Sequence, residues 1–217
     1  MDWERHVERE VQRYRDGDTR LPDETDADAR QRQLTRMGNA AGGAGLALLM
    51  AGRREEAADW FARAAERYRE SFDDAPPGSW GRPIGMIKSR VLAGDWPAAE
   101  REARFALEQG AADAESPIGR YAACLALLVL ARDAEARPLA DALRTQDGFP
   151  HDVGDALATI AARDRVGYVE AVEGVLESFE TRDEYLEDMP VADTVIVLQA
   201  LATRRDLAAG LSSPLLP

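Results

Sequence analysis

The sequence predicts an all-α fold of stacked antiparallel helix pairs, with an extra helix at the N-terminus and a capping helix at the C-terminus. Three observations lead to this. Apolar residues recur at spacings of three and four, the period of a helix with one buried face. Short segments return with the same glycine and alanine positions, as in a repeat array. Glycines, prolines and capping residues separate these segments. At 217 residues, one domain covering residues 1–217 is expected.

The first helix is expected to begin after Asp2, a good capping residue, and to end at Gly17. Its apolar side chains share one face, and they are Trp3, Val7, Val11 and Tyr14. This stripe either packs on the next helix or supports a homodimer.

The second helix is expected to begin at Thr25 or Asp26 and to end at Gly52. Its interior holds several glycines, which lower helix propensity by about 1 kcal/mol each relative to alanine. They therefore indicate a close approach by another helix. Residues 1–37 are assigned to N-terminal helices.

From there, a repeat is visible. Residues 51–64 and 93–107 match glycine to glycine, at Gly52 and Gly94, and alanine to alanine. The glycine can end one helix in a left-handed turn, and the alanines let the next helix pack closely. Residues 131–143 form a weaker copy without the glycine, and residues 162–179 form a looser one. We expect Ser116 and His151 to lie at the starts of two further helices.

These units resemble the tetratricopeptide repeat in the turn glycine, the alanines of the second helix and Gly45 within the first. The resemblance departs from the family in spacing, because Gly52 and Gly94 lie 42 residues apart instead of about 34. The large aromatic residues of the first helix and the prolines that end a repeat are also mostly missing. The resemblance implies a TPR-like α-α superhelix over residues 38–188.

In that family, the first helices of the pairs line a concave groove that receives a peptide. The resemblance therefore implies a protein or peptide partner for this chain. The groove contacts that it implies are Asn39, Lys88, Arg120 and Tyr121. Lys88 is the only lysine, and an ammonium in a concave surface could clamp a carboxylate.

A loop rich in proline and glycine joins the first two units, and it contains Trp80 and Arg82. Both residue types are enriched at the centres of protein interfaces. The hypothesis places these two side chains at the rim of the groove, although a loop tryptophan more often covers a neighbouring core than contacts a ligand.

The apolar run 191–202 predicts a last, largely buried helix, and residues 189–217 are assigned to this cap and to a non-helical tail. The closing pattern, residues 179–191 with the terminal 214–217, is similar to helical immunity proteins of bacterial toxin systems. This resemblance implies that the chain neutralises a toxin.

Glutamates recur at three- and four-residue steps along one helical face beside an apolar stripe. They are Glu170, Glu173, Glu177, Glu180, Glu184 and Glu187. Such a row could bind a basic partner, because it concentrates negative potential. The sequence favours the other interpretation, a solvated face in a salt-adapted protein, because like charges at these spacings destabilise a helix unless salt screens them.

The charge balance narrows the class of partner. Acidic residues number 40 against 27 basic ones, which gives a formal net charge of -13. Neither nucleic acid nor an anionic membrane is expected as a partner, because both require clustered positive charge. The acidic excess, with arginine in place of lysine, is similar to that of proteins from salt-loving microbes. No signal peptide or membrane span is apparent, so we expect a cytoplasmic protein.

No catalytic constellation or metal-ligand spacing is present, and neither metal nor cofactor is expected. His151 beside Asp152 is interpreted as a helix-start pair rather than a catalytic base. Cys124 lies in an apolar run and is expected to be buried and unreactive. The leading hypothesis is a non-catalytic protein-binding module. The alternatives are an immunity-type protein acting through its acidic face and a helical enzyme.

Overall fold

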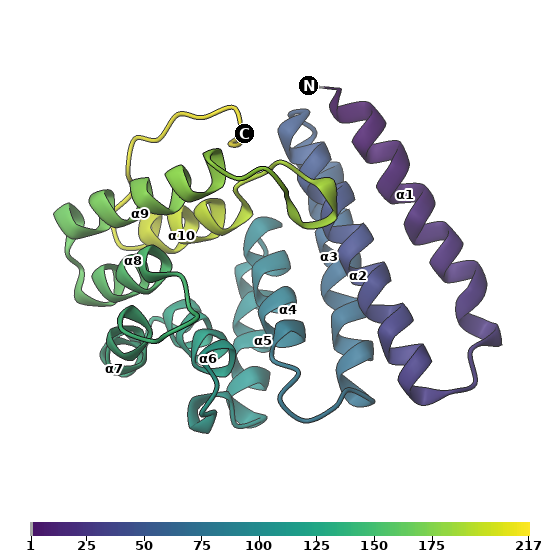
Figure 1. Cartoon of the computed structure of the whole chain (residues 1–217), viewed down its shortest axis with the longest axis horizontal. Coiled ribbons are helices and arrows are strands. Elements are labelled where there is room, and N and C mark those ends of the chain that lie inside the picture. The colour runs from purple at the N-terminus through teal and green to yellow at the C-terminus, as the bar shows by residue number, and fades with distance from the viewer. Residues whose placement is uncertain (1) are drawn as a thin grey trace. The chain divides into compact units, whose positions relative to one another are not determined.

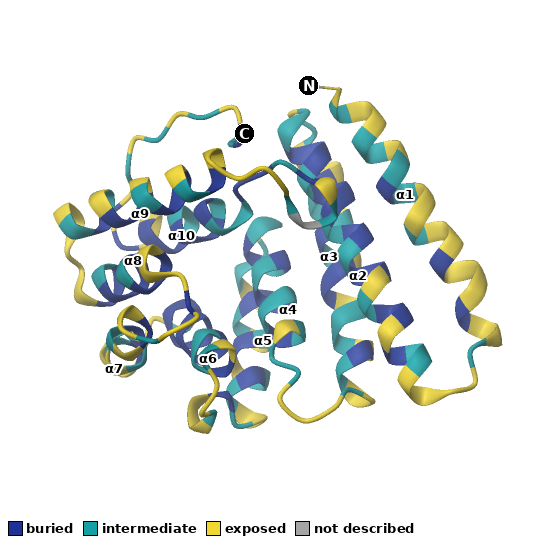
Figure 2. Ribbon diagram, in the orientation of Figure 1, coloured by how far each residue is buried: buried dark blue, intermediate teal, exposed yellow. Residues whose placement is uncertain are grey.

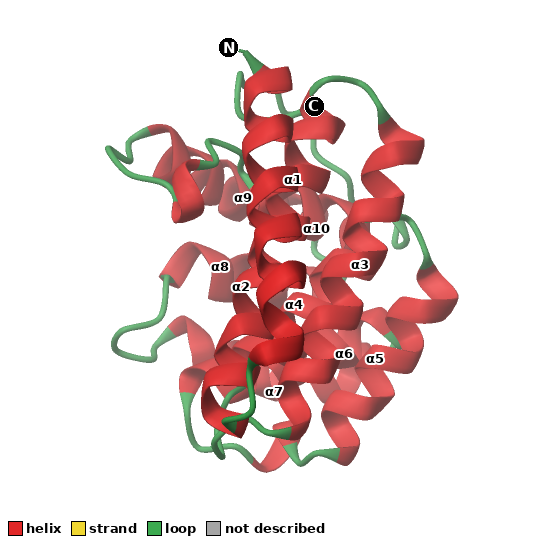
Figure 3. Ribbon diagram, turned by 90° about the vertical axis from the view of Figure 1, so that its right-hand side faces the viewer, coloured by secondary structure: helices red, strands yellow, loops and turns green. Residues whose placement is uncertain are grey.

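The computed structural model describes residues 2–217, apart from the side chain of Leu186. This part of the chain is all-α, as predicted, with neighbouring helices packed on one another and no strand (Figure 3). The α-helices are α1 (Trp3–Arg20), α2 (Ala27–Met50), α3 (Arg54–Asp73), α4 (Gly81–Leu92), α5 (Trp96–Glu108), α6 (Pro117–Val129), α7 (Asp133–Arg144), α8 (His151–Ala162), α9 (Arg165–Glu180) and α10 (Asp193–Thr203). Short 3-10 helices are η1 (Leu21–Asp23), η2 (Ala111–Asp113) and η3 (Leu186–Asp188). None of the described helices is long and apolar enough to cross a lipid bilayer.

Contacts divide the chain into two compact units. Unit 1 contains residues 2–95, Glu184–Val191 and Pro217, and unit 2 contains Trp96–Asp183 and Ala192–Leu216. The expectation of one domain over residues 1–217, subdivided at 37/38 and 188/189, stays a prediction.

In unit 1, α1 packs on α2, α2 on α3 and α3 on α4 (Figure 1). The contact between α2 and α3 is close at Gly45, where a Cβ atom would lie 2.7 Å from the ring of Phe61. The expectation that the glycines of this helix mark a close approach is confirmed there. Figure 2 shows that much of α2 is buried, while much of α1 is exposed.

In unit 2, the helices α5 to α9 pack in chain order, and α10 contacts α8 and α9. Small side chains such as Ala136 and Ala140 are fully buried between them. Cys124 is fully buried as well, and burial raises the pKa of its thiol to about 12. Its predicted burial is therefore confirmed.

Five helices end in the same way. The helices α2, α4, α6, α8 and α10 are each followed by a residue in the left-handed conformation, with φ of 77°, 73°, 57°, 56° and 61°. These residues are Gly52, Gly94, Ala131, Arg163 and Asp206. At each, the backbone N–H bonds to the carbonyl three residues earlier, and the next N–H bonds to the carbonyl five residues before itself. This is the Schellman arrangement, which satisfies carbonyls at a helix end.

The turns expected at Gly52 and Gly94 are confirmed. The degenerate copies keep the same turn without glycine, at Ala131 and Arg163. The tetratricopeptide resemblance itself stays a prediction.

Several helix starts are confirmed by their caps. Asp2 accepts a hydrogen bond from the N–H of Arg5 at 3.2 Å, Asp26 from Ala29 at 2.7 Å, and Ser116 from Gly119 at 3.1 Å. The predicted end of the first helix at Gly17 is wrong, since α1 continues to Arg20. Gly17 lies inside the helix, where a Cβ atom would lie 2.6 Å from the side chain of Met37 on α2.

Candidate functional site

Polar side chains follow one face of α2 in unit 1. Gln31, Thr35 and Asn39 are spaced by four residues, about one helical turn, so they face the same side over roughly 12 Å. The neighbouring helices add polar groups to this face: Tyr68 and Ser71 from α3, and Arg82 from α4. We call this set the polar seam, and it consists of Gln31, Thr35, Asn39, Tyr68, Ser71 and Arg82.

Arg82 lies at one end of the polar seam. Its Nε donates to Ser71 Oγ at 2.8 Å, and its Nη2 donates to Gln31 Oε1. Ser71 Oγ donates in turn to the main-chain oxygen of Gln31 at 2.7 Å. The three helices α2, α3 and α4 therefore hold the guanidinium in place.

Both partners of Arg82 are neutral. Across residues 2–217, no carboxylate forms an ion pair with this half-buried side chain. Burial lowers the pKa of Arg82 below its ordinary value, with no charged neighbour to offset it. Arg67 on α3 is a useful comparison, because it pairs with Asp18 and Glu70. A desolvated, uncompensated charge of this kind is a feature of functional sites.

Trp80 occupies the N-cap position of α4, two residues before Arg82, and is half-buried. The predicted pair at the rim therefore lies at the start of a helix that enters the polar seam. Lys88 is also half-buried on α4.

The other end of the polar seam binds a carboxylate from the chain itself. Asn39 Nδ2 donates to Glu187 Oε1 at 3.0 Å, and Tyr68 donates its hydroxyl to Asn39 Oδ1 at 2.8 Å. Arg13 on α1 pairs with the same carboxylate through Nη2. Arg9 Nη2 donates to the main-chain oxygen of Glu187 at 2.8 Å. We call Arg9, Arg13 and Asn39 the carboxylate clamp.

A buried carboxylate orients the two arginines of the clamp. The side chain of Glu10 is fully buried, and it accepts from Arg9 Nε at 2.7 Å and from Arg13 Nη1 at 3.0 Å. It lies against Gly43 of α2, where a Cβ atom would be 3.0 Å from Glu10 Cγ. The clamp is therefore preorganised by α1 and α2 rather than by its ligand.

The bound segment has an unusual backbone. Glu187 and Asp188 are consecutive non-glycine residues with φ of 55° and 53°. The left-handed region costs an L-residue about 1–2 kcal/mol. Burial opposes ionisation of Glu187, but the hydrogen bonds from Arg13 and Asn39, with the arginine charges, outweigh it and lower its pKa. The clamp thus stabilises an ionised side chain on a strained turn.

The acidic face is confirmed only in part. Glu170, Glu173, Glu177 and Glu180 are all exposed on α9 (Figure 2). The extension to Glu184 and Glu187 is wrong, because α9 ends at Glu180 and the chain then leaves the helix. Glu184 is exposed beyond the helix, and Glu187 enters the clamp of unit 1.

The remaining predicted contacts lie in unit 2. Arg120 Nη1 donates to Gln146 Oε1 at 2.9 Å, and the ring of Tyr121 lies 5.5 Å from that of Phe149. Both partners belong to the connection between α7 and α8. The six predicted contacts are thus divided between the units, with Asn39, Trp80, Arg82 and Lys88 in unit 1.

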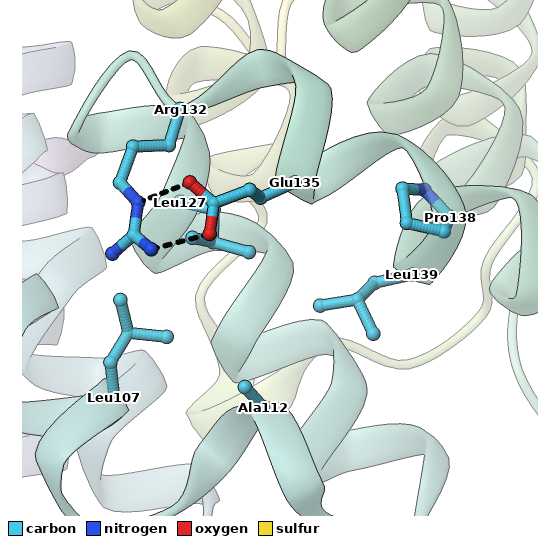
Figure 4. A pocket seen from close by; sticks show the side chains of 7 residues that line it. All are labelled: Leu107, Ala112, Leu127, Arg132, Glu135, Pro138 and Leu139. Carbon is cyan, nitrogen blue, oxygen red and sulfur yellow. Dashed lines mark hydrogen bonds and ion pairs between the residues drawn. The ribbon is translucent and has the colours of Figure 1, made fainter.

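Unit 2 also has an open hollow of about 260 Å³ that the sequence did not reveal (Figure 4). Its floor is mainly apolar, and an ion pair between Arg132 and Glu135 lies at one side, with Nε to Oε1 at 2.7 Å. The lining residues are Leu107, Ala112, Leu127, Arg132, Glu135, Pro138 and Leu139.

His151 has a structural contact. Its Nδ1 lies 2.6 Å from the main-chain oxygen of Arg144, so this ring atom carries the proton and donates it to the end of α7. The N-cap of α8 is Pro150, so His151 serves the preceding helix instead of capping its own. Within residues 2–217, no three His, Cys, Asp or Glu side chains gather in a way that could hold a metal ion.

Arg9, Glu10 and Arg13 are not among the site residues expected from the sequence. A signal was present, because Arg5, Arg9 and Arg13 repeat every four residues along the first helix and must share a face. Their ligand could not be found in this way, since Glu187 lies far along the chain.

In comparisons with known proteins, no family, no curated protein and no solved structure matches this chain.

Proposed function

We propose that the chain is a non-catalytic protein-binding module that takes an acidic segment of a partner protein at Arg82. The observation that carries this proposal is the half-buried guanidinium with only neutral partners. A carboxylate placed against it would supply the missing countercharge, and charge-assisted pairs with arginine are the stronger hydrogen bonds of proteins.

The geometry leaves donors for such a ligand. A guanidinium has five N–H donors. Ser71 and Gln31 receive one each, through Nε and Nη2, which leaves those of Nη1 and one of Nη2. Trp80, the N-cap residue of the same helix, is half-buried and is kept in the proposal as an aromatic contact. Lys88 is kept in the proposal as a second cation on α4.

The charge distribution supports an acidic ligand in spite of the acidic chain. Residues 1–95 contain 16 basic and 18 acidic side chains, a formal charge of -2. Residues 96–217 contain 11 basic and 22 acidic ones, a formal charge of -11. Residues 1–95, which include Arg82, are thus close to neutral, so they would repel an acidic segment only weakly. The larger excess elsewhere fits the expected adaptation to a salt-rich cytoplasm.

The experiment selects peptides that bind the full chain from a random-sequence display library. Selected peptides should be enriched in Asp or Glu, and Arg82→Gln should weaken their binding about tenfold or more, the scale of a lost charge-assisted contact. The matched control is Arg63→Gln, because Arg63 is an exposed arginine stacked on Trp60 at 4.6 Å. Selected peptides without acidic residues, or full binding by Arg82→Gln, would refute the proposal.

A second candidate rests on the acidic face. Glu170, Glu173, Glu177 and Glu180 form an exposed row on α9 that would attract a basic protein such as a toxin. A toxin encoded beside the gene, neutralised by the wild-type chain but not by Glu173→Lys/Glu177→Lys, would favour this immunity function. Neutralisation that survives the double substitution would exclude this face.

A further inference from the structure

Part of the segment between α9 and α10 belongs to unit 1 and binds in its carboxylate clamp, although both helices belong to unit 2. Residues Glu184–Val191 belong to unit 1, while the chain before and after them belongs to unit 2. The segment contains no regular element other than η3. Glu187 makes polar contacts with Arg9 and Asn39 of unit 1, and the side chains of Met189 and Val191 in the same segment are buried.

We propose that Arg9, Arg13 and Asn39 form a second binding site, for a glutamate presented on a tight turn, and that the Glu187–Asp188 turn is its internal ligand. An acidic segment of a partner protein displaces this turn. The inference adds a site to the proposed function and rests on it only for the class of partner.

The clamp recognises more than a charge. Asn39 and Arg13 reach the carboxylate of Glu187, and Arg9 reaches the main-chain oxygen of the same residue. Arg9 Nη2 also lies 3.4 Å from the main-chain oxygen of Asp188. Together these donors select a glutamate whose own carbonyl is turned the same way. Any segment with an exposed glutamate on such a turn presents this pattern.

The clamp is ready for such a segment without its present ligand. Glu10 forms ion pairs with both arginines. The hydroxyl of Tyr68 donates to the amide oxygen of Asn39, so the NH₂ group of this amide points to the carboxylate. Removal of the turn would leave these supports in place. A preorganised site of this kind keeps its affinity for a ligand supplied from outside.

The turn is suited to exchange. Two consecutive left-handed residues are strained, and the contacts of Glu187 are polar, so water can replace them. Met189 and Val191 are buried, with 5% and 3% of their surfaces exposed. They can anchor the segment while the Glu187–Asp188 turn swings out. A tethered ligand competes at an effective concentration in the millimolar range, so a free segment should bind the wild-type chain weakly.

The test uses a fluorescent peptide with the sequence of residues 181–191 and measures its anisotropy with the full-length chain. Glu187→Gln in the protein removes the charge of the internal ligand, and the peptide should then bind about tenfold more tightly than to the wild type. Glu184→Gln is the matched control, because Glu184 is an exposed glutamate of the same segment. It should leave the affinity unchanged.

Further variants locate the binding. Arg13→Ala in the Glu187→Gln background should abolish it, and a peptide with glutamine in place of its own Glu187 should not compete. Equal affinities for wild type and Glu187→Gln, or binding that survives Arg13→Ala, would overturn the inference. Arg82→Gln should leave this binding unchanged, so that failure at either site can be told from failure at the other.

A measurement on the wild-type chain covers the case in which Glu187→Gln does not fold. At a saturating concentration of the peptide, hydrogen exchange of the amides of residues 184–188 should become faster, because the turn has left the clamp. Unchanged exchange at saturation would contradict the inference.

Discussion

Arg205, just after α10, forms hydrogen bonds with residues of α6 and α7. We expect its replacement to lower the stability of the fold. The side chain of Arg205 is 4% exposed, and it donates to Asp133 through Nε at 3.1 Å and through Nη2 at 2.5 Å. It also donates to the main-chain oxygens of Leu128 at 2.7 Å and Leu201 at 2.9 Å. Arg205→Met keeps much of the volume and removes all four contacts.

The expected loss of stability follows from the Asp133 carboxylate that Arg205→Met leaves without this partner. Removal of one partner from a buried ion pair costs about 3–5 kcal/mol, because the other charge stays buried. Asp133 is 13% exposed and keeps Arg163 at 3.2 Å, so the lower end, about 3 kcal/mol, is expected. For a chain of this size, that corresponds to a fall in melting temperature of about 6–12 °C.

The loss should depend on pH. Burial opposes ionisation of Asp133, but the hydrogen bonds and charges of Arg205 and Arg163 outweigh it and lower its pKa. A lowered pKa contributes stability above the unfolded value of about 3.9, and this is lost as pH falls through the folded value. The difference between wild type and Arg205→Met should therefore be full at pH 7 and shrink below about pH 4.

Urea denaturation at pH 7 and pH 3 measures both quantities. Arg163→Met is the control, because Arg163 pairs with the same carboxylate but its side chain is 66% exposed. This substitution should lower the free energy of unfolding by about 0.5 kcal/mol or less. A loss under about 1 kcal/mol for Arg205→Met at pH 7, or a loss that does not shrink in acid, would show that the ion pair with Asp133 does not stabilise the fold in this way.

Three further predictions concern the scaffold. Gly45→Ala would place a Cβ atom 2.7 Å from the ring of Phe61 and should destabilise the chain by about 1–3 kcal/mol in urea denaturation; a neutral substitution would mean that the ring can move away. Asp26→Ala removes the cap of α2 and should cost about 1 kcal/mol, whereas Thr25→Ala should cost little; equal effects would contradict the assignment of the cap. Cys124 should resist iodoacetamide in the native chain at pH 8 and react when the chain is unfolded in urea, because burial raises its pKa to about 12; rapid native labelling, read by mass spectrometry, would be the contrary result.

Local chemistry made the helices predictable. Asp2, Asp26 and Ser116 are capping residues directly before apolar periodic segments, and each one caps a helix in the structure. The same reasoning was wrong at Gly17, because a glycine inside a helix and a glycine that ends one look alike in sequence. Only the approach of Met37 on the next helix distinguishes them.

The candidate site was predictable in its residue types but not in its pairings. Trp80 and Arg82 are residue types common at interfaces, and in the structure Arg82 lies where a countercharge is missing. Asn39 was expected to face a groove, and it binds Glu187, which lies 148 residues away. The glutamate spacing could not reveal this, because three- and four-residue steps continue past Glu180, where the helix ends. Pairings of this kind depend on tertiary structure.

The proposed function depends on one contact, that of Arg82 with the carboxylate of a partner segment. Its most direct test is NMR of the arginine Nε–Hε groups during titration with a library-selected acidic peptide. The Arg82 resonance should shift and saturate with the affinity measured for the peptide, and that of Arg63 should not move. If the chain is saturated with peptide and the Arg82 resonance does not shift, Arg82 does not receive the carboxylate.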